Sequence, residues 1–386
     1  MDRKAVIVVY GRSAVCKARK GALAGTHPVD YAAQVVKGVL RKIPQLPLEE
    51  IEDLIVGCAA HTYRASMNMA KLIADRAELP QEVCGQTINR FCSSSLQAIA
   101  TAANAIMAGQ GDIIIAGGVE DMTGTYEPYA QELMEPWLVK NRPGSYMPMG
   151  ITAENVAEKF GITREEMDSF ALASHAKAAK AQKEGKLAKS IIPVTVKDPS
   201  GQEHVVYQDE GIRPDSTMEV LSKLKPCFLP EGGTVTAATS SQTSDGAAFV
   251  VLMERSKAEA LGIQPIACLR GFAVAGCDAT LMGLGPIYAV PKAMKRASLT
   301  IEDMDDVELN EAFAAQAIPC IRELGLNPDK VNPYGGAIAL GHPMGATGAV
   351  LTCKLLDYLS ENSGKFGLVT MCIGGGMGAA GVFEMA

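Results

Sequence analysis

Cys92 is the residue whose surroundings most favour nucleophilic chemistry. It stands in Asn89-Arg-Phe-Cys92-Ser-Ser-Ser-Leu, ahead of a long apolar segment typical of a buried helix. A thiol at a helix N-terminus faces unpaired backbone N–H groups, so we expect its pKa to fall toward neutrality and its thiolate to react. The same N–H groups would stabilise an oxyanion on an attacked carbonyl. The alternative is a buried structural cysteine.

His342 is the candidate for acid–base chemistry. The chain has five histidines, and only this one lies in a glycine-rich stretch, with Pro343 after it and glycines at 335, 336, 341, 345 and 348. Glycine allows backbone to approach a ligand closely. An imidazole held in such a loop suits proton transfer near neutral pH. The alternative is a hydrogen-bonded structural histidine.

Cys372 ends an apolar run and opens the loop Ile373-Gly374-Gly375-Gly376-Met377-Gly378. Such a loop can aim backbone N–H groups at an anion, so one alternative is a phosphate-binding loop with an incidental cysteine. No lysine follows as in a P-loop, however. The apolar segment Gly381–Phe383 also predicts a strand where a dinucleotide fingerprint needs a helix.

Asn310 follows the apolar run Val307–Leu309 and precedes Glu311-Ala312-Phe313-Ala314. An amide at the end of a strand can hold a water or polarise a carbonyl. The alternative is a helix N-cap, with Glu311 in the first helical turn. Two cysteines, one histidine and one asparagine thus all stand in turns after apolar segments.

Short segments rich in Val and Ile alternate with helical patterns along the chain. The helix expected over Ser93–Gly109 is apolar on nearly all sides, so it should lie at the centre of the protein. This alternation predicts an α/β fold with parallel or mixed sheets and helices between layers. The predicted strands are Ala5–Val9, Ile51–Gly57, Asp112–Gly117, Val307–Asn310, Gly367–Cys372 and Gly381–Phe383.

The middle of the chain differs from its two ends. It has more charge and longer loops, and Thr163 with Glu166 predicts a capping box at a helix start. A loop–helix–strand order occurs after Asn89 and again after Gly335, which suggests an internal duplication. We therefore expect an N-terminal α/β half over 1–118, continued by 212–265, a loop domain over 119–211 that covers the active site, and a C-terminal α/β half over 266–386.

The composition excludes several classes of protein. Of the 386 residues 48% are hydrophobic and 20% charged, and the net charge of −7 argues against a nucleic-acid partner. No apolar run approaches the roughly 18–20 residues that cross a bilayer. The first residues show no secretory pattern, so we expect a protein that is not exported. Ten scattered cysteines without a CxxC pair or zinc-finger spacing predict a reducing compartment, which we expect to be the cytoplasm, and no metal site.

The sequence resembles the thiolase family over its whole length. Many long stretches match in family order and spacing: Asn89-Arg-Phe-Cys92-Ser-Ser, Gly117-Gly-Val-Glu-Asp-Met122, Met149-Gly-Ile-Thr-Ala-Glu-Asn-Val156, Gly233-Thr-Val-Thr-Ala237, Ser244-Asp-Gly-Ala-Ala248, Asn310-Glu-Ala-Phe313, Gly335-Gly-Ala-Ile-Ala-Leu-Gly-His-Pro343 and Cys372-Ile-Gly-Gly-Gly376. The resemblance implies a layered α-β-α-β-α fold of two duplicated halves plus an inserted loop domain. It also implies a homodimer or homotetramer.

The resemblance also implies a role for each matching residue. Cys92 would carry the acyl group, and His342 would activate it and help to stabilise the thioester oxygen. Cys372 would exchange a proton with the α-carbon of acetyl-CoA. Asn310 would hold a water in one oxyanion hole, and the N–H groups of Cys92 and Gly374 would form the other. The enzyme would be an acyltransferase without a tightly bound cofactor, and coenzyme A would be a co-substrate. Contacts with CoA are implied for Arg213, Phe228, Ser241, Met149 and Phe313.

Several stretches resemble the degradative 3-ketoacyl-CoA thiolases of fatty-acid β-oxidation. They are Met147-Pro-Met-Gly-Ile-Thr152, Asp209-Glu-Gly-Ile-Arg-Pro214 and Val331-Asn-Pro-Tyr-Gly-Gly336. Pro148 stands where the short-chain branch more often has His. Ser95 replaces the usual Gly, and Ala238-Thr239 replace a common Gly-Asn pair. Other β-oxidation enzymes are possible partners.

Three other functions remain open at this point. A short-chain acetyl-CoA C-acetyltransferase would make acetoacetyl-CoA. A decarboxylating ketoacyl synthase would lack the second cysteine, so Cys372 argues against it. An inactive CoA-binding scaffold subunit would not need the four chemical residues together.

Overall fold

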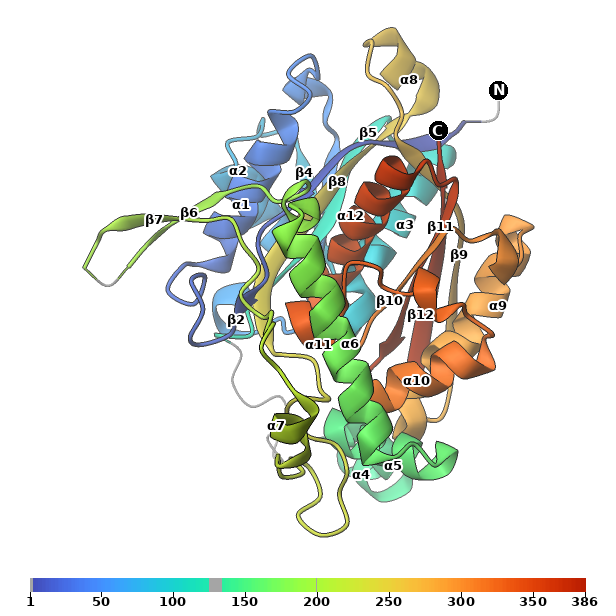
Figure 1. Cartoon of the computed structure of the whole chain (residues 1–386). Coiled ribbons are helices and arrows are strands. Elements are labelled where there is room, and N and C mark those ends of the chain that lie inside the picture. Colours follow the sequence, from blue (N-terminus) through green and yellow to red (C-terminus); the bar gives the residue numbers. More distant parts are fainter. Residues whose placement is uncertain (1–2, 125–133, 199) are drawn as a thin grey trace.

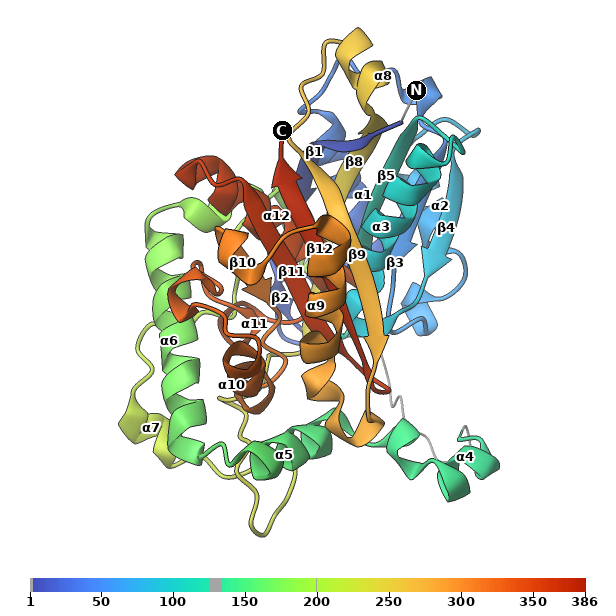
Figure 2. The same ribbon diagram turned by 90° about the vertical axis from the view of Figure 1, so that its right-hand side faces the viewer.

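Layers of helix alternate with layers of sheet throughout the molecule (Figures 1 and 2). The computed structural model describes residues 3–124, 134–198 and 200–386. In this part of the chain the main sheet has the strand order β10-β11-β12-β9-β1-β8-β5-β3-β4, and the short β2 pairs with β8. Its two halves meet through the antiparallel pair Ile7–Ala267 of β1 and β9.

The N-terminal half contains the strands β1 (Ala5–Arg12), β2 (Cys16–Lys17), β3 (Asp53–Gly57), β4 (Cys84–Ile88), β5 (Ile113–Glu120) and β8 (Ser244–Glu254). Its outer face packs on the helices α1 (Pro28–Leu40) and α2 (Met69–Arg76). Strands β5 and β8 are buried along their whole length, because helices cover the sheet on both faces.

The C-terminal half repeats this arrangement with β9 (Ala267–Gly276), β10 (Asp306–Leu309), β11 (Phe366–Ile373) and β12 (Met377–Met385). The helices α9 (Gly285–Ala297) and α10 (Ala314–Glu323) cover its outer face. Strand β3 pairs in parallel with β4 and β5, and β10 pairs in parallel with β11 and, at Val307, with Val331. In each half the parallel strands are followed by antiparallel ones, in the order β5-β8-β1 in the N-terminal half and β11-β12-β9 in the C-terminal half. The predicted fold class, with its two related halves, is confirmed.

The central layer consists of α3 (Ser94–Met107) and α12 (Met344–Asn362), which pack against each other and against both halves of the sheet. Their first turns meet closely. A Cβ atom on Gly348 would lie 2.5 Å from the backbone nitrogen of Leu96, so no side chain fits there. The hydroxyl of Ser95 accepts a hydrogen bond of 2.9 Å from the N–H of Ala349. The serine that replaces the usual glycine thus links the two central helices.

The region between the two halves carries most of the remaining elements. They are α4 (Pro136–Asn141), α5 (Met149–Phe160), α6 (Arg164–Lys183), the hairpin β6 (Val194–Lys197) and β7 (Glu203–Val206), and α7 (Met218–Ser222). Thr163 caps α6, and its capping box with Glu166 is confirmed. The hairpin projects from the body of the molecule (Figure 1). The boundaries of the predicted loop domain stay predictions, and its residues 125–133 lie outside the described residues.

Several elements differ from the prediction. The sequence patterns gave no strand at β4, β8 or β9, and β12 is longer than the expected Gly381–Phe383. The glycine loop after Cys372 is the turn of the β11–β12 hairpin, where Ile373 pairs with Met377. Phe313 rather than Asn310 precedes α10 as its N-cap. Among the described residues no helix is both long and apolar enough to cross a membrane.

A buried ion pair lies between β10 and α12. The Nζ atom of Lys354 lies 2.7 Å from Glu308 Oε2, and the two side chains are 2% and 0% exposed. Asp306, on the same strand, is also buried, and within residues 3–124, 134–198 and 200–386 neither of its carboxylate oxygens has a side-chain hydrogen-bond partner. Burial raises the pKa of Asp306 well above its usual range and raises that of Glu308. Lys354 therefore provides the positive charge beside two buried acids.

We predict that Lys354→Met lowers the free energy of unfolding by about 3–5 kcal/mol, because it leaves Glu308 buried without its partner. The matched control is Lys223→Met, which removes an exposed ion pair with Glu219. That change should cost less than about 1 kcal/mol. Urea denaturation at one protein concentration measures both. Equal losses for the two variants would contradict the assignment.

Candidate active site

Cys92 lies in a single helical turn, Phe91–Ser93, directly before α3. This turn packs against α12 and β11, which brings Cys92 to the junction of the two halves. The side chain of Asn89 accepts the N–H of Phe91 at 2.8 Å, and Ser94 Oγ accepts the N–H of Arg90 at 2.9 Å. Phe91 has a φ of +45°, so its backbone is in the left-handed region that non-glycine residues rarely adopt. Local hydrogen bonds therefore fix the turn that presents the thiol.

The expected fall in the pKa of Cys92 is wrong. Burial raises the pKa of this thiol to about 11, although hydrogen bonds from the N–H groups of Gly374 and Cys92 itself act in the opposite direction. The negative charge of Glu120 adds to the increase. The cost of removing a thiolate from water outweighs the donors at the helix start. Cys92 is therefore a neutral thiol at neutral pH.

His342 lies between the short helix α11 (Ala337–Leu340) and α12. Its N–H donates to Gln242 O at 2.9 Å, and its ring atom Nδ1 lies 2.7 Å from Thr347 Oγ1. Ring atom Nε2 is buried and has no hydrogen-bond partner in the part of the chain that the structure describes. Burial lowers the pKa of His342 to about 4, so the imidazole is neutral at neutral pH. A neutral ring with an unpaired nitrogen can accept or share a proton.

Cys372 is the last but one residue of β11 and is almost fully buried. Burial raises its pKa well above the usual value, and the nearby Cys92 adds to the increase. The two thiols therefore lie close enough for the charge of one to oppose ionisation of the other. Gly374 follows two residues later, and its N–H lies against Cys92. A thiol with so high a pKa is protonated at neutral pH.

Asn310 directly follows β10 and is completely buried. Its backbone N–H donates to Thr370 O on β11 at 3.0 Å, two residues before Cys372. Both polar atoms of its side chain lack a hydrogen-bond partner among the described residues. A buried amide with unused donor and acceptor atoms is costly unless a water or a ligand satisfies it.

An apolar cluster surrounds Cys372 on the side of α5. Phe228 and Phe313 form an edge-to-face pair with ring centres 5.9 Å apart, and they pack in one cluster with Met149 and Cys372. A Cβ atom on Gly374 would lie 3.5 Å from Met149 Sδ, which brings Met149 beside the glycine loop. Ser241 donates its N–H to Ala312 O at 2.9 Å, next to Phe313. Four of the expected CoA-contacting residues thus gather near Cys372.

Arg213 lies apart from this cluster, in a surface hollow of about 470 Å³. The hollow is lined by residues of four segments: His175, Ile212, Arg213, Pro214, Asp215, Ser216, Val220, Leu221, Leu224, Ala237, Ala238, Gln242 and Ile338. The backbone oxygen of its wall residue Gln242 accepts the N–H of His342, so the hollow adjoins the backbone of this residue. The N–H of Arg213 donates to His175 Nδ1 at 3.1 Å.

The sequence analysis missed three residues that hold these groups. Thr347 contacts the ring of His342, and Gln242 holds its backbone. Glu120 accepts the N–H of Gly345 near the start of α12 at 2.7 Å. Thr347 stands five residues after His342 in the expected helix, which was the one local signal available. The other two contacts join distant segments and leave no local pattern.

The fold and these side chains define a site of two neighbouring thiols, Cys92 and Cys372, between related halves, with His342 just before α12 and Asn310 just after β10. Comparison with known proteins identifies the family. Residues 5–256 match the family model "Thiolase, N-terminal domain", and residues 263–385 match "Thiolase, C-terminal domain". The chain belongs to the thiolase family and is an acyltransferase.

Relatives resemble this chain over nearly its full length. A 3-ketoacyl-CoA thiolase of Bacillus subtilis is 49% identical and aligns with 99% of this chain and 100% of its own. The human peroxisomal 3-ketoacyl-CoA thiolase is 46% identical over 98% of this chain and 90% of its own. The crystal structure of an acetyl-CoA acetyltransferase of Bacillus anthracis superposes with a TM-score of 0.92 and 38% identity, covering 100% of this chain and 99% of its own.

We predict that alkylation of Cys92 by iodoacetamide accelerates about tenfold per pH unit from about pH 6 to about pH 9.5, because the thiolate is the reactive form and the pKa lies near 11. Mass spectrometry of the peptide that contains Cys92 measures the rate. The exposed Cys84 in the same digest is the internal reference for the reagent. A plateau near pH 7 or 8 would show that the thiol ionises there and would contradict the prediction.

Proposed function

We propose that this enzyme cleaves 3-ketoacyl-CoA with coenzyme A to give acetyl-CoA and a shortened acyl-CoA. The observation that carries the proposal is the meeting of Cys92 and Cys372 beside the N–H of Gly374, near the site of His342. Cleavage between C2 and C3 requires a nucleophile for C3 and a proton donor for C2. Cys92, with His342 to accept its proton, can act as the nucleophile, and Cys372 can act as the proton donor.

In the first half of the reaction the sulfur of Cys92 attacks the C3 carbonyl while its proton passes to His342 Nε2. The oxyanion at C3 would accept hydrogen bonds from the N–H groups of Cys92 and Gly374. The C2–C3 bond then breaks, and its electron pair leaves as the enolate of acetyl-CoA. Cys372 donates its proton to C2, acetyl-CoA departs, and the acyl group remains on Cys92.

In the second half the thiol of coenzyme A gives its proton to the Cys372 thiolate and attacks the acyl–Cys92 thioester. Cys92 leaves as a thiolate and recovers its proton from His342, so all protons are restored. Asn310 would hold a water that donates to the thioester oxygen of the enolate, together with His342. The unsatisfied amide of Asn310 and the unpaired Nε2 atom of His342 support this assignment.

The binding of coenzyme A is assigned to the hollow that contains Arg213. A guanidinium can pair with a phosphate or stack on adenine, which suits the nucleotide end of CoA. Phe228, Ser241, Met149 and Phe313 would then contact the pantetheine and thioester ends. Phe228, Phe313 and Met149 cluster with Cys372, which supports placing the thioester end of CoA beside this thiol.

The 3-ketoacyl subclass rests on the relatives that carry this name at 46–49% identity. A short-chain acetyl-CoA C-acetyltransferase is the second candidate, since a structure with that title superposes closely at 38% identity. The cytoplasm stays the predicted compartment, and association with other β-oxidation enzymes stays a prediction.

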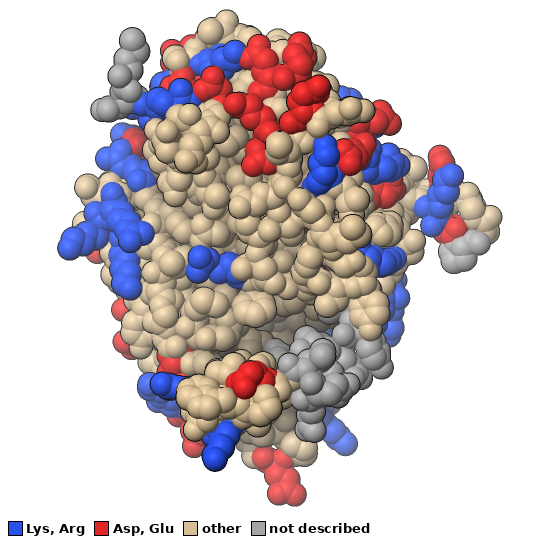
Figure 3. All heavy atoms as spheres, turned by 180° about the vertical axis from the view of Figure 1, so that it is seen from behind, with Lys and Arg blue, Asp and Glu red and all other residues tan. Residues whose placement is uncertain are grey.

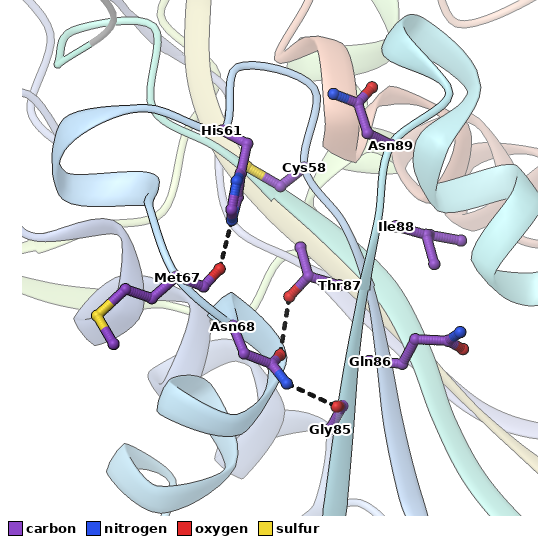
Figure 4. Close-up of a pocket in the computed structure, with 9 residues that line it drawn as sticks. All are labelled: Cys58, His61, Met67, Asn68, Gly85, Gln86, Thr87, Ile88 and Asn89. Carbon is purple, nitrogen blue, oxygen red and sulfur yellow. Dashed lines mark hydrogen bonds between the residues drawn. The ribbon is translucent and has the colours of Figure 1, made fainter.

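We also propose that the enzyme acts as a homodimer or homotetramer. Strand β4 ends the strand order of the sheet, and the exposed side chains of Tyr63 and Met67 lie in the segment before α2 beside it. A hollow of about 470 Å³ opens there between this segment and β4, where Asn68 bonds to Gly85 and Thr87 (Figure 4). The rear face of the molecule carries few charged side chains across its middle (Figure 3). An unpaired edge strand and a surface with few charges are both typical of the contact between two protein chains, so they support the proposed homo-oligomer.

Thiolysis of a chain-length series tests the proposed function. We predict cleavage of 3-ketoacyl-CoA esters with acyl chains longer than four carbons at a kcat/KM above that of acetoacetyl-CoA. Cys92→Ala should lose activity by a factor of about 10⁴ or more, because no other group can carry the acyl chain. Loss of absorbance of the ketoacyl-CoA enolate measures each rate. Wild-type turnover in Cys92→Ala would refute the mechanism, and a preference for acetoacetyl-CoA would favour the second candidate.

A further inference from the structure

Glu120, the last residue of β5, is a fully buried carboxylate close to the reacting groups. Its Oε2 atom accepts the N–H groups of Ala59 at 3.0 Å and of Gly345 at 2.7 Å. Its Oε1 atom accepts the N–H of Ala60 at 3.0 Å and faces the thiol of Cys58 at 3.9 Å. Each of these four partners is a donor, so the carboxylate serves only as an acceptor, as its ionised form does.

These contacts connect Glu120 to the nucleophile. Ala59, which donates to Glu120, accepts a hydrogen bond of 2.9 Å from Asn89 Nδ2. Asn89 Oδ1 in turn accepts the N–H of Phe91, whose left-handed backbone sets the turn of Cys92. One carboxylate therefore anchors, through two links, the loop that presents the thiol.

The same carboxylate holds the histidine segment. Gly345 lies in the first turn of α12, three residues after His342. A Cβ atom on Gly345 would lie 2.7 Å from the nitrogen of Ala59 and 2.9 Å from Glu120 Oε2, so only glycine allows this approach. Glu120 thus bridges the start of α12, from the C-terminal half, to the Ala59–Ala60 loop, from the N-terminal half.

We propose that Glu120 is a positioning residue, which sets the placement of Cys92 relative to His342 by holding both of their segments on one carboxylate. This inference rests on the proposed thiolysis, in which the two residues exchange a proton. The hydrogen bonds of Glu120 fix the placement of Cys92 relative to His342 before substrate binds. A displacement of about 1 Å between two reacting groups can lower the rate about 10²-fold.

The charge of Glu120 also acts on the thiol. Burial is the largest cause of the raised pKa of Cys92, and the negative charge of Glu120 raises this pKa further. The same charge also raises the pKa of Cys58. The other titratable groups near Glu120 are Tyr31, Cys58, Asp121, which pairs with Arg64, and Asp245. Removing the charge at residue 120 should therefore lower the pKa of Cys92, while moving the charge slightly should not.

The test compares Glu120→Gln and Glu120→Asp in the full-length enzyme. The amide of Gln places an NH₂ group against backbone N–H donors, and Asp is one methylene too short to reach both loops. For both variants we expect kcat for thiolysis to fall about 10- to 100-fold, with KM for CoA within about threefold of wild type. The pH profile of Cys92 alkylation should move to lower pH in Glu120→Gln and stay in place in Glu120→Asp.

The matched control is Asp305→Asn. Asp305 Oδ2 also accepts two backbone N–H groups, from Lys365 and Phe366, but at the start of β11, away from the site. This variant should keep kcat within about twofold. A wild-type kcat in Glu120→Asp, or an equal loss in Asp305→Asn, would overturn the proposal. Glu120→Asp decides alone if Glu120→Gln does not fold. A wild-type enzyme without thiolysis would instead refute the proposed function, and the alkylation profiles would still report on Glu120.

Discussion

The close contact between the first turns of α3 and α12 is the constraint on which the site depends. Gly345 and Gly348 have no room for a side chain, and Ser95 bonds directly across the contact to Ala349. Each helix belongs to one of the two related halves, and each is preceded by a reactive residue. Packing the two helix starts together therefore places Cys92 beside the segment of His342. The duplication of the fold produces the site, because neither half contains both residues.

Burial at this contact decides the protonation of the reacting groups. Burial raises the pKa of Cys92 and of Cys372 and lowers that of His342, so all three groups are neutral at neutral pH. A neutral thiol does not attack by itself, and the proton must leave as the substrate binds. In the proposed mechanism the N–H groups of Cys92 and Gly374 then face an oxygen on which charge develops during reaction. Charge is thus stabilised where it forms in the transition state.

The sequence allowed the layered fold and the position of the main reactive residues to be predicted, for identifiable reasons. The Val- and Ile-rich runs predicted β5 and β11, and the apolar segment after Cys92 predicted α3. Strands β8 and β9 were not predicted, although Asp245-Gly246 opens β8 and Gly262 and Pro265 precede β9. Strand β4 is only partly buried and has no long apolar run. The pKa of Cys92 was mispredicted because the helix start is visible in the sequence while the depth of burial is not. The contacts of Glu120 with Ala59 and Gly345 span 61 and 225 residues, and no local sequence pattern records them.

The division of work between two thiols is the central claim, and the location of the acyl group tests it most directly. The Cys372→Ala enzyme is incubated with hexanoyl-CoA, quenched in acid and digested, and the peptides are weighed by mass spectrometry. The account predicts a hexanoyl group on the peptide that contains Cys92, because Cys92 carries the acyl group, and the CoA thiolate is stable enough to depart without the proton that Cys372 supplies in wild type. A hexanoyl group on any other residue, or no acylated peptide in Cys372→Ala while wild type is acylated, would contradict it.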